Sequence, residues 1–429
     1  MSAFPSNSAV KNTTHKVVLP FYAYAAVSFL AAAILLLSSS PDFTGHYFHP
    51  HILAITHIMA IGWGTMIILG AGHQLLPVLT ESKLHSVKLA YASFILTAIG
   101  IPLLIYGFYV FDMGPIAKWG GRLVLLGMLC FVINTGISVS KAKNENVHAI
   151  FFFTASIWLF ITAFMGLAQV YNFTTWLLPE NSLHYLSLHV HTGAIGWFLL
   201  LIIGVGSRLI PMFLISKYEN PKLLWWIYGL VHAGLFGFIL LFFFSAYRYL
   251  LFGPIVLVAL AFFLFIFYCF KAYKLRLRKQ VDEPVKLSLL SVALMALPLL
   301  LLMAVIFILA AGRQEPLEFS LAYGFLIFFG WITALILGMT FKTLPFIVWN
   351  KVYHKLAGKV KTPNPKELFS VSIFNWMSGA YLFGLFIFGG SIILRLQIGL
   401  KAGASLLLVT ALLYVWNVMR VLFHKPLLP

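Results

Sequence analysis

Charged residues are scarce in this chain, and cysteine is almost absent. Asp, Glu, Lys and Arg together make up 9% of the 429 residues, whereas 61% are hydrophobic. Average soluble domains carry about 25% charged residues, so the composition excludes both a soluble globular protein and a disordered one. The two cysteines, Cys130 and Cys269, lie in separate apolar stretches and form no CxxC motif. The sequence therefore predicts no disulfide and gives no indication of the redox compartment.

Acidic side chains are also missing from the interior of the apolar stretches. All 11 Asp and Glu residues fall at the ends of these stretches or between them. Carboxylates bridge di-iron centres, bind hard cations and carry protons through membrane proteins. Their absence argues against each of these sites and leaves histidine as the available buried ligand.

Long apolar stretches dominate instead, and each has the roughly 20 residues that a transmembrane helix needs. We predict an all-α integral membrane protein that forms a single domain over residues 1–429, with no cleavable signal peptide before the first span. The twelve predicted spans are 17–39, 51–77, 86–110, 119–139, 147–171, 184–214, 221–246, 250–272, 286–311, 317–347, 367–391 and 400–424.

The basic charge of the chain is distributed asymmetrically. The formal net charge is +18, and most Lys and Arg residues lie near the termini or in the loops after even-numbered spans. The loops after odd-numbered spans hold few: Lys118, Arg122, Arg248, Arg313, Arg395 and Lys401. Positively charged loops stay in the cytoplasm, so we expect both termini to be cytoplasmic, in a bacterial-type inner membrane. The charge should contact membrane lipid and not nucleic acid.

One sequence motif occurs three times at a fixed spacing. Residues 57–77 read HIMAIGWGTMIILGAGHQLLP, residues 191–211 read HTGAIGWFLLLIIGVGSRLIP, and residues 325–345 read FLIFFGWITALILGMTFKTLP. The copies share the frame GW-x6-G-x6-P and are 134 residues apart. The repeat predicts three four-helix units, about 17–139, 147–272 and 286–424, arranged with pseudo-threefold symmetry. Small residues let membrane helices approach closely, so the glycines are expected to serve packing.

Histidines gather near the same ends of two motif copies. Of the 14 histidines, eight lie at or below the predicted outer surface: His46, His49, His51, His57, His184, His189, His191 and His232. The others, including His73, are expected at the cytoplasmic interface. Intramembrane ionisable residues usually mark functional sites, and imidazole suits iron, copper and zinc.

The positions of these histidines predict which of them can act together. His57 and His191 occupy equivalent positions of the repeat, roughly 10 Å below the outer surface at 1.5 Å per residue. His189 and His191 are two residues apart and therefore face different neighbours, whereas His184 and His191 share a helix face. We predict a haem or a metal between His57 or His51 and one of His189 and His191.

Twelve spans in three four-helix units, with histidines in the outer third of the second helix of a unit, resemble subunit I of the haem–copper oxidase superfamily. The resemblance includes its nitric oxide reductase branch and the related NnrS proteins. It implies that His57, or else His51, binds a haem, b-type in this chain, and that Arg395 contacts its propionates. It also implies a copper site at His189, His191 and His232, with His184 and His49 as further candidate metal ligands. The family's tenth helix carries an HxH motif, whereas residues 317–347 contain no histidine.

Three functions follow from these observations. The first is a haem- or copper-binding respiratory-type membrane protein of nitric oxide or nitrogen-oxide metabolism or defence. The second is a terminal oxidase or nitric oxide reductase subunit that works with a partner chain. With no CxxCH motif, its electrons would come from a quinol or a separate redox subunit. The third is a haem-free scaffold or copper-handling protein, in which HYFHPH (46–51) captures copper.

Overall fold

The computed structural model describes residues 15–142, 146–244, 247–359 and 361–426 and is helical almost throughout. In these residues, twelve helices or helix combinations are long and apolar enough to cross a membrane, which confirms the predicted number of spans and identifies a multi-pass membrane protein. In chain order they are α1 (His15–Ser38); α2, η2 and α3 (Pro50–His57, Ile58–Thr65, Met66–Thr80); α4 (Val87–Tyr109); α5 (Pro115–Ser140); α6 (Val147–Thr175); α7, η3 and α8 (Leu186–His191, Thr192–Leu199, Leu200–Leu214); α9 (Pro221–Phe244); η4 and α10 (Arg248–Leu251, Phe252–Lys274); α11 and α12 (Glu283–Leu294, Ala296–Ala310); α13, η5 and α14 (Leu317–Phe325, Leu326–Ile332, Thr333–Tyr353); α15 (Val371–Leu394); and α16 (Gln397–Leu422).

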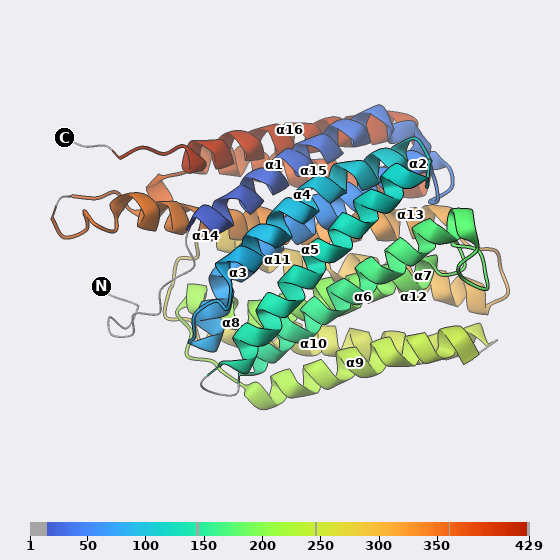
Figure 1. Cartoon of the computed structure of the whole chain (residues 1–429), viewed down its shortest axis with the longest axis horizontal. Helices are drawn as coiled ribbons and strands as arrows, with labels where there is room; N and C mark the ends of the chain where they lie inside the picture. Colours follow the sequence, from blue (N-terminus) through green and yellow to red (C-terminus); the bar gives the residue numbers. More distant parts are fainter. Residues whose placement is uncertain (1–14, 143–145, 245–246, 360, 427–429) are drawn as a thin grey trace.

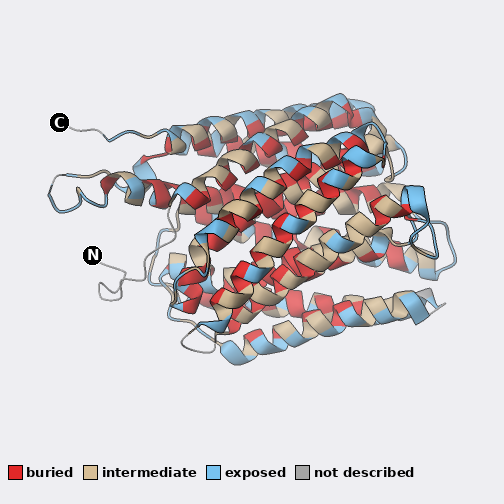
Figure 2. Cartoon of the chain, in the orientation of Figure 1, coloured by how far each residue is buried: buried red, intermediate tan, exposed pale blue. Residues whose placement is uncertain are grey.

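The spans lie side by side along one direction, so the bundle has two ends (Figure 1). We call the end where α1 begins and α16 ends the terminal end. The opposite end carries the starts of α2, α7 and α13 (Figure 1), and we call it the histidine end because most of the candidate histidines lie there. Buried residues line the inward sides of the helices, and exposed residues cover the outside (Figure 2). Many of the exposed side chains are large and apolar, such as Phe244 and Trp376, as expected where lipid is the solvent.

The three motif copies form the most buried spans of the bundle. Within an 18-residue stretch of the spans Pro50–Thr80, Leu186–Leu214 and Leu317–Tyr353, 67, 67 and 72% of the residues are buried, whereas the same share is 56% or less in every other span. Each of the three begins as an α-helix, continues as a π-helix that contains the Gly-Trp pair, and ends as an α-helix. The π-helices begin at Ile58, Thr192 and Leu326, which are 134 residues apart. The sequence repeat is therefore accompanied by the same local helix geometry, which was not predicted.

The second glycine of each motif lets its span pack closely on the preceding span of the chain. A Cβ at Gly70 would overlap Phe21 of α1, one at Gly204 would overlap Phe151 of α6, and one at Gly338 would overlap Ser288 of α11. These contacts agree with the packing role predicted for the motif glycines.

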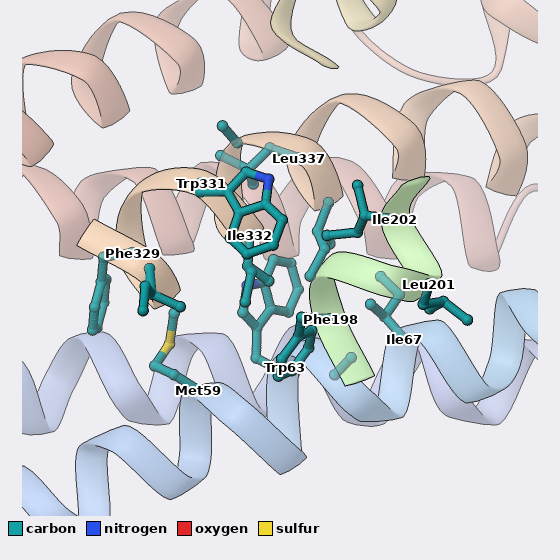
Figure 3. Close-up of a cluster of buried hydrophobic side chains, with 14 of the residues drawn as sticks. Met59, Trp63, Ile67, Phe198, Leu201, Ile202, Phe329, Trp331, Ile332 and Leu337 are labelled. Carbon is teal, nitrogen blue, oxygen red and sulfur yellow. The ribbon is translucent and has the colours of Figure 1, made fainter. Parts of the chain in front are cut away.

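Two of the motif tryptophans, Trp63 and Trp331, lie in one buried apolar cluster (Figure 3), and Trp197 is buried as well. The Trp63 indole N–H donates to Thr333 Oγ1 at 3.0 Å, and the Trp197 indole N–H donates to Thr65 Oγ1 at 3.1 Å. Each bond joins the tryptophan of one motif copy to the residue two positions after the tryptophan of another copy. For Trp331 the corresponding position is Leu199, which offers no acceptor on its side chain. Buried indoles need such partners, so these bonds fix how the motif spans face one another.

The ninth predicted span is interrupted, in contrast to the single helix expected over 286–311. α11 ends at Leu294 and α12 begins at Ala296. Pro298 lacks the N–H that would bond to the Leu294 carbonyl, and its ring crowds that carbonyl. The proline therefore accounts for the break.

Two buried asparagines fix the loops at the terminal end to neighbouring helices. Asn417 of α16 accepts a hydrogen bond from the Ser370 backbone N–H and donates to the Ser370 carbonyl, both at 2.9 Å. Asn134 of α5 makes the same pair of bonds with Ser86. Each asparagine satisfies two backbone groups at the start of the preceding span, as expected for an interhelical hydrogen bond in a membrane.

Replacing Asn417 with leucine should lower the free energy of unfolding by about 1–3 kcal/mol, because it leaves the Ser370 N–H and carbonyl unpaired. The measurement is thermal unfolding of the purified protein in detergent. Gln397→Leu, at an exposed position on the same helix, is the matched control and should leave the melting temperature unchanged. Equal melting temperatures for Asn417→Leu and the control would contradict the prediction.

An ion-pair network at the terminal end joins α11 to α14. Lys342 Nζ donates to Asp282 Oδ2 at 2.6 Å, and Arg278 donates to Asp282 Oδ1 at 2.5 Å. Burial alone would raise the pKa of Asp282, but the hydrogen bond and charge of Lys342, with the charge of Arg278, hold the pKa below its ordinary value of 3.8. Because the folded pKa is the lower one, the carboxylate stabilises the fold above pH 3.8, and this contribution is lost as the pH falls through the folded pKa.

Asp282→Asn should therefore lower the melting temperature at pH 7. When the pH is reduced from 5 to below the ordinary Asp pKa of about 3.9, the melting temperature of this variant should fall less than that of the unaltered protein. Thermal unfolding in detergent at both pH values measures this. Glu283→Gln, which affects only the more exposed pair with Lys286, is the control and should change little. If the melting temperature falls equally with pH in the unaltered protein and in Asp282→Asn, Asp282 does not have the predicted role.

Candidate functional site

A large apolar cavity lies at the histidine end, between the motif spans and the helices around them. Its volume is about 820 Å³, within the range of about 300–1,000 Å³ of small-molecule and cofactor sites. Its walls come from elements of all three predicted units, including η2, η3 and η5. Four histidines line it: His57, His184, His189 and His191. Among the described lining residues, Glu315 is the only side chain that is an Asp, Glu, Lys or Arg.

The carboxylate of Glu315 is already engaged at the rim of this cavity. It accepts hydrogen bonds from Ser320 Oγ at 2.7 Å and from the Tyr47 hydroxyl at 3.4 Å. Burial and the charge of Glu315 raise the pKa of Tyr47, so the phenol stays protonated and keeps its donor role. Glu315 therefore joins the segment before α13 to the segment before α2.

His57 is the last residue of α2, directly before the π-helix. Its Nδ1 is 2.8 Å from the Leu53 carbonyl. Because a carbonyl can only accept, Nδ1 carries the proton and Nε2 keeps the lone pair of the neutral ring. Metal-binding histidines commonly donate their other N–H to a carbonyl in this way. The local helix thus presets the tautomer that a ligand of iron or copper needs.

His189 lies beside His57 at the interface between α2 and α7. The ring centroids are 6.2 Å apart and the ring planes differ by 16°. The His189 Nδ1 is buried and makes no hydrogen bond in the described part of the chain, and its ring lies beside the Thr162 carbonyl. The ring occupies the space that Gly166 leaves open, since a Cβ there would lie 2.9 Å from its Cε1. A bound metal would give this unpaired ring nitrogen a partner, and a second histidine lies close enough to take part.

His191 makes the equivalent contacts one repeat later, but its ring is already paired. Its Nδ1 bonds to the Ser187 carbonyl at 2.7 Å, as His57 does with Leu53. Its Nε2 accepts from the Tyr323 hydroxyl at 3.3 Å. Tyr323 lies 134 residues after His189, so the pairs His57–His189 and His191–Tyr323 are the same interface in successive copies. The His191–Tyr323 interface has a hydrogen bond between its two side chains, whereas at the His57–His189 interface the His189 Nδ1 has no partner among the described residues.

The structure brings some of the other predicted residues to the cavity and leaves others away from it. The ring of His184 lines the cavity and packs against Phe242 at 5.0 Å. His232, on α9, bonds to the Tyr228 carbonyl at 2.9 Å and is not a lining residue. Arg395 directly follows α15, is exposed and forms an ion pair of 2.8 Å with Glu318, and it is not a lining residue either. His73, expected at the interface, is 1% exposed, because it packs between aromatic rings of α1 and α5.

His49 and His51 form a separate cluster at the start of α2. The Nδ1 of His51 is 2.7 Å from Asp42 Oδ2, and the Nδ1 of His49 is 3.7 Å from the same oxygen. Asp42 lies in the short helix η1 (Ser40–Thr44). His51 therefore does not share the cavity with His57, although the two are only six residues apart, because the first turns of α2 point them in different directions.

Sequence reasoning missed three residues of these sites: Asp42, Gly166 and Tyr323. Tyr323 could have been found from the repeat, since it occupies the position of His189 one copy later. Asp42 and Gly166 carry no such signal, because they come from η1 and from α6, which both lie outside the motif.

Comparison with known proteins gives a distant relative and no function. A stretch of 303 residues is 27% identical to an "Uncharacterized protein" of Aquifex aeolicus (strain VF5), covering 69% of this chain and 72% of that protein. No family model matches the chain. The function is therefore inferred from the cavity and its histidines.

Proposed function

We propose that this protein is a haem-binding membrane protein in which His57 and His189 would hold a b-type haem. The observation that carries the proposal is the pair itself: two nearly parallel imidazoles with centroids 6.2 Å apart, one with a preset tautomer and one with an orphaned nitrogen. Metal–imidazole bonds are about 2 Å long, so two imidazoles can hold one metal only if their rings lie within a few ångströms of each other. The spacing of the rings is compatible with such a centre.

The residues of the chain would have distinct tasks around the group. The Leu53 carbonyl keeps the proton of His57 on Nδ1, and Gly166 provides room for the His189 ring. The apolar lining would limit the access of water and lower the local dielectric. Both effects, together with the ligands, set the redox potential of a bound metal. A bound haem would supply reversible one-electron transfer or binding of a diatomic gas.

The architecture supports the resemblance to subunit I of haem–copper oxidases and to NnrS proteins as part of this proposal. The motif spans recur every 134 residues, their π-helices are equivalent, and Trp63 and Trp197 make equivalent bonds. We infer three four-helix units around a pseudo-threefold axis, in a bacterial-type inner membrane with the terminal end in the cytoplasm. The function is then in nitric oxide or nitrogen-oxide metabolism or defence, with electrons from a quinol or a partner redox subunit.

A copper ion held by the same two histidines is the second candidate. The cavity lining described here contains neither Lys nor Arg, whereas a haem carries two negatively charged propionates that usually need cationic or polar partners. This observation favours a bare metal ion, and imidazole is a suitable ligand for copper. The same cavity then serves copper handling without haem.

A reduced-minus-oxidised optical spectrum of the purified protein, with metal analysis of the same sample, tests both candidates. A Soret band with near-stoichiometric iron supports haem, and a shift of that band with nitric oxide or carbon monoxide supports gas binding. A spectrum without haem bands, with copper near one per chain, supports the second candidate. Absence of both haem and copper after expression with added iron, haem precursor and copper would refute the proposed function.

A further inference from the structure

We propose that Asp42, His49 and His51 form a second metal site, for a divalent first-row transition ion such as Zn²⁺, on the surface of the histidine end. One ligand atom from each of the three residues lies within 4.8 Å of the others. The His49 and His51 rings are 5.0 Å apart at 74°. This site is separate from the His57–His189 pair and does not depend on the proposed function.

A surface ion pair between His51 and Asp42 explains only part of this cluster. The distance of 2.7 Å from His51 Nδ1 to Asp42 Oδ2 is a hydrogen bond. The Nδ1 of His49 is also directed at Asp42, but at 3.7 Å it makes no hydrogen bond, and this atom is shielded from solvent without a partner in the described residues. A buried nitrogen that makes no hydrogen bond costs free energy unless another group becomes its partner.

A bound metal would satisfy all three groups with small movements. Ligand atoms about 2.0–2.1 Å from a tetrahedral Zn²⁺ are about 3.3 Å apart. The His51–Asp42 distance would increase from 2.7 Å and the His49–Asp42 distance would decrease from 3.7 Å, each by about half an ångström. The side chains are 27–38% exposed, so an ion can enter from solvent, and a fourth position remains for water.

The backbone holds the three ligands in place. Pro50, the first residue of α2, separates the two histidines, and His49 precedes it in an extended conformation. The His51 ring stacks on Tyr109 at 4.6 Å and 22°. Asp42 is fixed by the turn of η1, where Gly45 N–H bonds to its carbonyl at 3.0 Å. Two imidazoles and one carboxylate favour Zn²⁺ or Cu²⁺ over Mg²⁺ or Ca²⁺.

Metal binding here would stiffen one wall of the cavity. The segment between the ligands includes Phe43, Tyr47 and Phe48, which line the cavity. An ion that joins Asp42 to His49 and His51 closes this segment into a loop. The site would therefore stabilise this wall of the cavity without contacting the His57–His189 pair.

The test is isothermal titration of the full-length, metal-stripped protein in detergent with Zn²⁺. We expect one site per chain, with binding weakened at least 100-fold in Asp42→Asn and in His49→Gln. His46→Gln is the matched control, since His46 lies in the same loop but outside the cluster, and should bind as the unaltered protein does. His57→Ala should also keep this affinity, which separates failure of this site from failure of the proposed function.

Zinc-edge X-ray absorption of the unaltered protein gives a second measurement that does not depend on how the variants fold. Two imidazoles with oxygen ligands at about 2.0–2.2 Å support the site. No binding below about 100 µM, or equal affinity in the folded Asp42→Asn and His49→Gln variants, would overturn it.

Discussion

Replacing His189 with alanine should remove at least nine-tenths of the haem or copper that we propose binds to this protein. The variant leaves His57 as the only member of the proposed pair, and loss of one of two ligands would remove about half of the protein's bonds to the metal. His57→Ala should have the same effect. Cofactor content per chain, from the optical spectrum and metal analysis, is the measurement.

His232→Ala is the matched control for this prediction. His232 makes the same type of Nδ1 bond to a carbonyl four residues earlier as His57 does, but it does not line the cavity. His232→Ala should therefore retain the cofactor. His191→Ala should also retain most of it, because Tyr323 already occupies the His191 Nε2. Full cofactor content in His189→Ala would eliminate His189 as a ligand.

A steric variant tests the same site with both histidines present. Gly166→Ala places a Cβ about 2.9 Å from the His189 ring, closer than real Cβ contacts allow, so the ring must move. We expect weaker cofactor binding, with an altered spectrum of what remains. An unaltered spectrum would mean that the position of this ring is unimportant.

Replacing Gly338 with alanine should destabilise the protein by about 1–3 kcal/mol. The added Cβ would overlap Ser288 and would lie 2.5 Å from the Pro284 carbonyl oxygen. The carbonyl belongs to the backbone of α11, so the obstacle cannot turn away as a flexible side chain could. Thermal unfolding in detergent measures the loss of stability.

Gly390→Ala is the control for Gly338→Ala. It also lies within a membrane-spanning helix, but nothing lies within 4 Å of a Cβ added there. Alanine has the higher helix propensity, so this variant should be neutral or slightly more stable. If both variants unfold at the same temperature, close approach at the motif glycine does not limit stability.

The membrane fold could be predicted from the sequence because it depends on local composition. Each apolar stretch must satisfy its own backbone hydrogen bonds in lipid, and only a helix does so within one segment. The predicted spans therefore match the observed ones to within a few residues, and the tenth extends farthest beyond its prediction, to Tyr353 instead of 347. The motif at 134-residue intervals also indicated Gly70, Gly204 and Gly338 as packing positions before any contact was known.

Which polar groups meet was decided only by the tertiary structure. The sequence placed His57, His51, His189 and His191 near one another but left their pairing open. The structure pairs His57 with His189 and His191 with Tyr323, and it sets His51 apart with Asp42. These pairings depend on the rotation of each span about its axis, which the packing of Gly166, Trp63 and their neighbours fixes through contacts between distant segments. Hydropathy and spacing determine that a helix forms and how deep a residue lies, whereas the partner of a buried histidine depends on a second helix whose position no local pattern encodes.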